Sequence, residues 1–417
     1  QELVGVYAQD QFSAGDTLTL NFAIRYNSTM NPDGLAHLFP EGREIPDDTD
    51  NWAPRFGFAW TPGSEGRDVI RGGIGLFYGR TPSLLFASQV QQNGLFPNFG
   101  RVFVSPGEIG FVPLGTSIDN ENPPVDAPNS PAYVDPSFED SETWRINLGY
   151  ERELGNGWVT GLDAVWAEAD KLQSNVELNR TLAGLDEFGR PFYSSTRPNS
   201  DFNEIFTRQS ISESEYTALT FKIEKRWAGK YQVQAHYTWS SDEDNDSNER
   251  SATGIDISNP ADLDYDWGPS DREVENRFVL SGVVELPYDF QLSGIYEYRD
   301  GTPWTAIDSG VDFAYCGFGR LGFNCPDPRA IINGERVSRN SFNNDSVTRF
   351  DVRLSKFFVV NDWRIDVFAE VFNVFDENTF GVAFGQRDPA EGNEFGVGDT
   401  LFTTPRQVQL GARISFR

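Results

Sequence analysis

A strict alternation of apolar and polar residues, repeated along almost the whole chain, constrains the fold of this sequence more than any other feature. Between Trp144 and Tyr150 every second residue is large and apolar, and polar or small residues stand between them. Residues 407–416 alternate in the same way. Side chains of a strand point to opposite faces at successive positions. Each such run therefore predicts a strand with one apolar and one polar face.

The predicted strands are long, and there are about thirteen of them. They are residues 2–13, 15–27, 51–62, 67–80, 142–155, 157–171, 213–228, 230–242, 272–287, 289–302, 346–360, 363–377 and 403–417. Strands of globular proteins most often have about 5–6 residues, whereas a tilted strand that crosses a membrane needs about 9–11. The lengths of these segments therefore favour transmembrane strands.

The connections between these segments alternate between short and long. The short ones are residues 13–16, 62–68, 155–156, 228–230, 287–289 and 361–362. The long ones are residues 28–50, 81–141, 172–212, 243–271, 303–345 and 378–402. Short periplasmic turns and long extracellular loops are typical of outer-membrane barrels, whereas a soluble sandwich or propeller would mix the two lengths. We therefore predict an all-β protein, a transmembrane antiparallel up-and-down β-barrel of the cell outer membrane.

The charge balance and the aromatic content exclude two other classes of protein. The chain has 63 acidic and 34 basic residues, a net charge of −29, and no basic patch, so nucleic acid is not an expected partner. Its 34 Phe, 14 Tyr and 10 Trp argue against a disordered acidic chain. Tryptophans near predicted strand ends match the aromatic belts of a membrane interface. They are Trp144, Trp158, Trp166, Trp227, Trp239, Trp304 and Trp363.

The strand directions predict that further strands precede Gln1. With all short turns on one side, the first and the last of thirteen strands run in the same direction. If these thirteen strands closed into a barrel, the first and last would pair in parallel, whereas outer-membrane barrels are antiparallel throughout. An open sheet would leave unpaired backbone groups in lipid. We therefore expect residues 1–417 to be the C-terminal part of a 22-stranded barrel, with about nine strands and an N-terminal plug outside this sequence.

Several segments resemble TonB-dependent receptors. Asn-Trp-Ala-Pro-Arg-Phe-Gly-Phe-Ala-Trp-Thr-Pro at residues 51–62, with residues 71–79, resembles a strand pair of Oar-like members. Residues 276–287 resemble a later strand of the same group. Glu-Val-Phe-Asn-Val-Phe-Asp at residues 370–376 resembles the penultimate strand of the family, and residues 406–417 resemble its last strand. The resemblance covers essentially the whole chain.

The resemblance implies a receptor or transporter that takes up a ligand with energy from TonB, ExbB and ExbD, coupled through an N-terminal part that this sequence lacks. It implies contact with outer-membrane lipid and lipopolysaccharide, and with surface or periplasmic protein partners. Phe416 resembles the terminal aromatic that the barrel-assembly machinery recognises, although Arg417 follows it here. The alternatives are a barrel that anchors surface loops for adhesion or assembly, a passive porin, and a soluble β-rich carbohydrate-binding protein.

The two cysteines favour a disulfide. Cys316 and Cys325 are nine positions apart in a Gly-rich predicted loop, and close spacing in an exposed loop suits an oxidising compartment. Two free thiols are the alternative. Neither a His nor a further Cys is near, so a metal site is not expected there.

Catalysis finds little support in the sequence. His37 falls in a predicted loop, and His236 falls on a predicted polar face with Ser240 nearby. Serine and aspartate are so frequent here that such a pairing carries little information. The Gly-rich residues 72–79 lack the dinucleotide-binding spacing, and no helix follows them. We therefore expect no enzyme activity.

Calcium is the only cofactor that the sequence suggests, and weakly. Asp242, Asp244 and Asp246 show the acidic alternation of a calcium loop, but its turn glycine and its bidentate glutamate are both missing. Residues 47–50 are a second weak candidate. A solvated acidic loop is the simpler interpretation of both.

Two further sets of residues are candidates for function. The polar faces of the predicted strands would line the barrel interior and contact a plug. They carry Arg145, Lys222, Glu224, Arg226, Gln232, Gln234, His236, Asp351, Arg353, Arg364, Asp366 and Arg413. The long loop at residues 81–141 has a hydrophobic cluster that needs a covering surface, either a ligand or partner outside or the barrel mouth itself. It comprises Leu84, Leu85, Phe86, Leu95, Phe96, Phe99 and Phe103.

Overall fold

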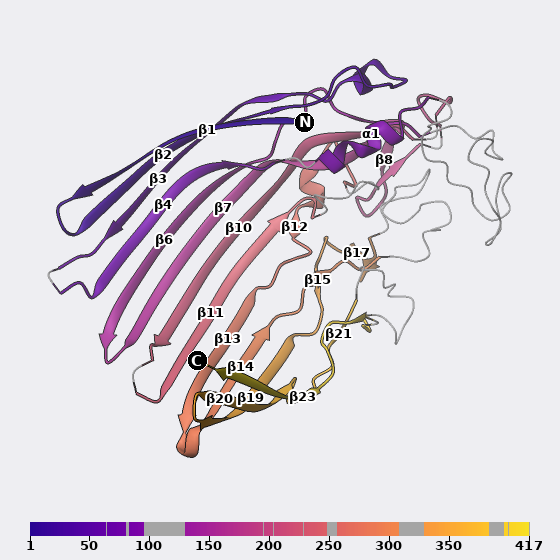
Figure 1. Cartoon of the computed structure of the whole chain (residues 1–417). Coiled ribbons are helices and arrows are strands. Elements are labelled where there is room, and N and C mark those ends of the chain that lie inside the picture. Colours follow the sequence, from indigo (N-terminus) through magenta and orange to yellow (C-terminus); the bar gives the residue numbers. More distant parts are fainter. Residues whose placement is uncertain are drawn as a thin grey trace.

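Thirteen long strands lie side by side in chain order in one curved antiparallel sheet (Figure 1). The computed structural model describes residues 1–63, 65–80, 83–95, 130–194, 196–202, 204–227, 229–247, 257–307, 329–382, 396–398 and 400–416. The strands are β1 (Glu2–Ala14), β2 (Leu18–Met30), β3 (Asp48–Trp60), β4 (Asp68–Tyr78), β6 (Glu142–Gly155), β7 (Trp158–Glu177), β10 (Phe206–Lys225), β11 (Tyr231–Asp244), β13 (Asn276–Leu286), β14 (Phe290–Arg299), β19 (Val347–Val360), β20 (Trp363–Phe372) and β23 (Gln407–Phe416). The predicted all-β, up-and-down architecture is confirmed.

Tight turns join the strands in pairs at one end of the sheet, which we call the turn end. Residues Asn156 and Gly157 connect β6 to β7 with φ angles of 52° and 78°. Asn361, with a φ of 54°, connects β19 to β20. Two-residue hairpins of the type that matches strand twist need positive φ angles, which Asn and Gly adopt most readily. The short turns are therefore encoded locally.

The apolar residues of the strands form one face of the sheet, which we call the outer face. Cross-strand register aligns Phe22, Phe56, Ile74 and Ile146 in one row across four strands. Leu148 in the middle of β6 is 53% exposed. Among the described residues, the clusters of buried apolar side chains lie in the loops or where a loop meets the end of β10. The strands therefore present their apolar side chains outward instead of burying them.

The long loops fold into a cap at the opposite end of the sheet, the loop end (Figure 1). The elements that the described parts of these loops form are short helices and short strands. They are η1 (Pro40–Arg43), η2 (Ser83–Phe86), α1 (Ala87–Gln91), β5 (Ala132–Val134), β8 (Leu182–Leu185), β9 (Pro191–Tyr193), η3 (Leu263–Asp266), β12 (Gly268–Pro269), β15 (Pro303–Trp304), β16 (Ile331–Ile332), β17 (Glu335–Arg336), β18 (Phe342–Asn343), β21 (Phe380–Gly381) and β22 (Thr400–Leu401). No helix in the described part of the chain is long and apolar enough to span a membrane.

Strands β7 and β10 extend further into the cap than the predicted segments 157–171 and 213–228. Each has 20 residues, a reach of about 65 Å at 3.3 Å per residue, about twice the thickness of the hydrocarbon core. The extension of β10 pairs with β7 on one side and, in parallel, with β5 on the other. The loop after β4 therefore crosses to a strand that is not its neighbour in the sheet.

Trp304 does not lie in an aromatic belt, and this prediction was wrong. Its side chain is 6% exposed and stacks on Phe342 at 5.0 Å between ring centroids. It belongs to a cluster with Ala306, Ala330 and Val382 inside the cap. The tryptophan therefore forms part of a small loop core, which proximity to a strand end could not distinguish from a membrane interface.

Candidate functional site

The polar face of the sheet, which we call the inner face, is the first candidate site. Directly opposed residues of an antiparallel pair point to the same side. The register opposes Lys222 to His236, and Asp366 to Arg413. Together with the alternation along each strand, it places on this face Arg145, Lys222, Glu224, Gln232, Gln234, His236, Asp351, Arg353, Arg364, Asp366 and Arg413. Arg226 lies in the turn after β10, 3.9 Å from Glu224.

Four charged residues of the inner face form a closed ring across four strands. Arg71 of β4 lies 3.6 Å from Glu151 of β6 and 3.1 Å from Asp163 of β7. Lys222 of β10 lies 2.9 Å from Glu151 and 3.4 Å from Asp163. Charges alternate around the ring, which is neutral as a whole. Because all four side chains are partly exposed, each pair contributes at most about 1 kcal/mol, and the main effect is to fix their positions.

Glycines make room for this ring. Gly149 stands between Arg71 and Asp163 in the register, and a Cβ there would lie 2.4 Å from the Asp163 carboxylate. Gly161 stands opposite Lys222, and a Cβ there would lie 2.4 Å from Lys222 Cε. The side chain of Arg71 passes over Gly149 to reach Asp163, two strands away. The side chain of Lys222 passes over Gly161 to reach Glu151, also two strands away. Lys222 was predicted as an inner-face residue, whereas Arg71, Glu151 and Asp163 were not, although the same alternation places all three on this face.

A second charged centre lies further along the sheet. The guanidinium of Arg353 on β19 is 3.3 Å from Asp366 and 3.3 Å from Glu370, both on β20. It also stacks on Phe368, 3.7 Å from the ring centroid. Arg353 therefore has both carboxylate partners and an aromatic surface.

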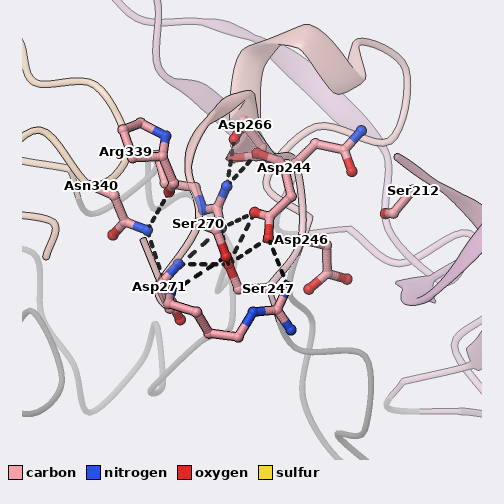
Figure 2. Close-up of polar contacts among 12 residues, drawn as sticks. Ser212, Asp244, Asp246, Ser247, Asp266, Ser270, Asp271, Arg339 and Asn340 are labelled. Atoms are coloured by element: carbon pink, nitrogen blue, oxygen red, sulfur yellow. Dashed lines mark hydrogen bonds and ion pairs between the residues drawn. The ribbon is translucent and has the colours of Figure 1, made fainter. Parts of the chain in front are cut away.

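The C-terminal end of β11, the loop that follows it and the loop between β14 and β19 meet in a buried polar network in the cap (Figure 2). Arg339 donates to the carboxylate and the backbone carbonyl of Asp244 and to the hydroxyl of Ser247. The Asp244 side chain is 1% exposed and that of Arg339 is 13% exposed. Asn340 donates to the carbonyl of Pro269 and to the carboxylate of Asp271, both at 2.7 Å. The pair of Asp244 and Arg339 thus joins segments 95 residues apart.

A neighbouring buried pair extends this network. The Asp266 carboxylate accepts a hydrogen bond from Arg329, whose guanidinium also donates to the carbonyl of Tyr265 at 2.9 Å. Arg190 donates to the carbonyl of Arg329 at 3.1 Å. Because breaking a buried ion pair leaves an uncompensated charge, these contacts hold the cap loops in one arrangement. No local pattern in the sequence marks Arg329, Arg339 or Asp266.

The calcium candidates have protein partners in the structure. Asp244 pairs with Arg339, as Figure 2 shows, and with Arg272 at 3.7 Å. Asp246 accepts a hydrogen bond from Ser174 at 2.5 Å. Asp242 is half-buried at the end of β11. Among the described residues, no three acidic, His or Cys side chains are grouped so that they could hold a metal ion. A cation at Asp244 would have to displace an arginine.

His37 and Phe86 both lie in the interior of the cap. His37 is 3% exposed, and its Nε2 is 2.9 Å from the carbonyl of Ala132, while its Nδ1 accepts a hydrogen bond from the backbone N–H of Phe39 at 3.1 Å. Burial lowers the pKa of His37. Phe86 packs against Ile45 in an apolar cluster, so for this residue the structure favours packing at the barrel mouth over an exposed contact.

The other loop candidates and the cysteines can be placed only in part. Leu84 and Leu85 lie in η2, and Leu95 is half-buried after α1. Outside the described residues lie Phe96, Phe99, Phe103, Cys316 and Cys325. The hydroxyl of Ser240 donates to the carbonyl of Val274 at 2.8 Å. That hydroxyl is therefore directed to the backbone and not to His236.

Comparisons with known proteins agree with the fold. A sequence model described as "Outer membrane beta barrel domain" matches residues 1–409. No curated protein sequence matches the chain. Solved structures with a similar fold include the outer membrane transporter YddB from Escherichia coli, with 12% identity and a TM-score of 0.61 over 99% of this chain and 45% of that chain.

Two further solved structures have the same fold. The FrpB iron transporter from Neisseria meningitidis, variant F3-3, has 11% identity and a TM-score of 0.54 over 98% of this chain and 44% of that chain. The siderophore receptor PiuA from Acinetobacter baumannii has 11% identity and a TM-score of 0.50 over 99% of this chain and 42% of that chain. This chain thus covers less than half the length of each of these proteins.

Replacing Arg339 should loosen the cap. An Arg339→Ala variant leaves the buried Asp244 carboxylate without its main partner, at a typical cost of about 3–5 kcal/mol. We expect proteinase K to cleave the loops of the full-length protein on intact cells at least about tenfold faster, since about 1.4 kcal/mol corresponds to tenfold. Arg406→Ala removes an exposed pair with Asp376 and should change cleavage little. Equal cleavage of the two variants would contradict the structural role of Arg339.

The cap should also loosen at acidic pH through His37. Its pKa is lower in the folded cap than in an unfolded one, so the opened cap binds a proton more readily. The contribution of neutral His37 to the stability of the cap is fully present above about pH 6.5, the ordinary pKa of histidine. It is lost as the pH falls below this value towards the lower pKa that His37 has in the folded cap. Hydrogen-exchange protection of residues 37–45 and 130–138 should decrease over this range. In the His37→Gln variant, whose side chain does not titrate, this decrease in protection should be absent. If the decrease persists in this variant, groups other than His37 cause it.

Proposed function

Because this chain belongs to the family of outer membrane β-barrel domains, we propose that it forms part of the wall and the receptor face of a transporter that takes up a ligand with energy from TonB. Its location is the outer membrane, and its outer face contacts lipid and lipopolysaccharide. The folds of an outer membrane transporter, an iron transporter and a siderophore receptor are similar to it. These similarities in fold do not identify the transported ligand.

The observation that carries the proposal is the combination of a charged inner face with a folded cap. An inner face with ion pairs such as those of Lys222 and Arg353 suits contact with a polar domain inside the barrel. The buried pairs of the cap hold the loops over the mouth in a fixed arrangement, as ligand capture requires. A wide passive channel also has a polar interior, but it does not need loops held fixed over its mouth.

The open sheet supports a larger barrel. The strand order runs from β1 to β23, and these two strands do not pair with each other. The backbone N–H and C=O groups on the outer edges of β1 and β23 are unpaired, and lipid cannot hydrogen-bond them, so these edges need further strands as partners. We propose that further strands close the barrel and that a plug fills it, so that residues 1–417 are its C-terminal part. In this arrangement TonB, ExbB and ExbD act through the plug, and Phe416 on the outer face of β23 is the signal for the barrel-assembly machinery.

Planar-bilayer recordings of the full-length protein test this proposal against a passive porin. A plugged receptor should give little steady conductance, and urea that unfolds the plug reversibly should open large steps. The periplasmic domain of TonB should bind the same preparation. Large steady conductance without urea would support a porin, and a closed barrel that does not bind TonB would support a surface-anchoring role.

A further inference from the structure

A cavity of about 540 Å³ opens on the inner face just below the cap, against β1, β2 and β3. This volume is within the usual range of about 300–1,000 Å³ for small-molecule sites. Among the described residues that line it, Arg25, Arg55 and Arg80 are basic and Asp140 is the only carboxylate. Asp140 is 5% exposed and accepts a hydrogen bond from the Thr29 hydroxyl at 3.2 Å. The described lining therefore carries an excess of positive charge.

Arg55 has hydrogen-bonding capacity that the protein does not use. Its guanidinium lies over the ring of Phe77, 4.1 Å from the centroid. Its Nε is shielded from solvent and has no hydrogen-bond acceptor. Stacking uses the flat face of a guanidinium and leaves its N–H edge available for a planar anion. A buried donor without an acceptor costs about 1–3 kcal/mol, which a bound oxyanion would offset.

Arg145 stands beside Arg55 across a glycine. Gly75 is opposed to Arg55 on one side and to Arg145 on the other. A Cβ at Gly75 would lie 3.0 Å from Arg55 Cγ and 3.1 Å from Phe77 Cε2. The glycine therefore leaves space above the sheet between two arginines of the same row.

Unlike Arg71 and Arg353, the arginines at and beside this cavity have no acidic partner among the described residues. Among the described residues, Arg25, Arg55, Arg80 and Arg145 form no salt bridge, and Arg25 donates only to the Asn27 side chain at 2.8 Å. In contrast, Arg71 and Arg353 each contact two carboxylates. In a chain with a net charge of −29, acidic partners are abundant. In the part of the chain that the structure describes, the positive charge at this cavity is not neutralised, and this is the feature that an anionic ligand would match.

We infer that this cavity binds the oxyanion groups of a small, multiply charged ligand, with Arg55 and Arg25, both part of its lining, as the main donors. Guanidinium groups bind carboxylates and phosphates through paired, charge-assisted hydrogen bonds. Several arginines around one cavity select a ligand with more than one such group. The inference rests on the proposed function, in which the cavity lies inside the mouth of the barrel. It narrows the substrate class to anionic small molecules.

Calorimetry of the full-length protein in detergent, with citrate and inorganic phosphate as probes, tests the inference. Citrate should bind at one site, and a neutral triamide of the same shape should not. Arg55→Gln and Arg25→Gln should each weaken citrate binding at least about tenfold, or about 1.4 kcal/mol. Gly75→Ala, which changes no charge but displaces Arg55, should also weaken it. Arg364→Gln makes the same charge change at the turn end of the inner face and should have no effect.

Two results would overturn the inference. One is equal citrate binding by the wild type, Arg55→Gln and Arg25→Gln. The other is that the wild type binds neither citrate nor phosphate. If the two arginine variants then also melt at a lower temperature than the wild type, an acidic side chain of the protein itself fills the cavity. Conductance and TonB binding do not depend on these arginines. A plugged, TonB-binding protein that fails to bind citrate therefore refutes this inference alone and leaves the proposed function intact.

Discussion

Pairing of the backbone in lipid is the constraint on which the rest of this structure depends. Hydrocarbon offers no hydrogen-bond partner to an N–H or C=O group, so each strand must pair with a neighbour along its whole membrane-spanning length. The sheet from β1 to β23 meets this requirement through continuous antiparallel register. Successive side chains then face lipid and interior in turn. One geometric rule thus produces the exposed apolar rows and the charged inner face together.

This rule explains why so much of the fold could be predicted from the sequence. Alternation located all thirteen strands, and the short connections at residues 155–156 and 361–362 were predicted between them. Contacts between distant segments could not be predicted. The pair of Arg339 and Asp244 joins residues 95 positions apart, and the extension of β10 depends on its pairing with β5. Neither leaves a periodic signal, because loops follow no repeating geometry. Trp304 was misplaced for the same reason.

Charge is organised differently at three levels of the molecule. Positions of the inner face near the turn end carry the neutral ring of Arg71, Glu151, Asp163 and Lys222. The cap above it contains buried pairs that fix the loops. Between the two levels lie arginines without acidic partners. A rigid wall and a fixed cap place this uncompensated charge at the entrance to the interior, where an anionic ligand would arrive first.

The most direct measurement of the central claim is the accessibility of single nitroxide labels on β6 in the full-length protein reconstituted in lipid. A label at Leu148 should collide with lipid-soluble oxygen and hardly with a water-soluble nickel chelate. A label at Asn147, which points to the other face, should have lower oxygen accessibility than the label at Leu148. If the label at Leu148 is shielded from both reagents, the apolar row is buried against protein, and the assignment of the outer face to lipid is wrong.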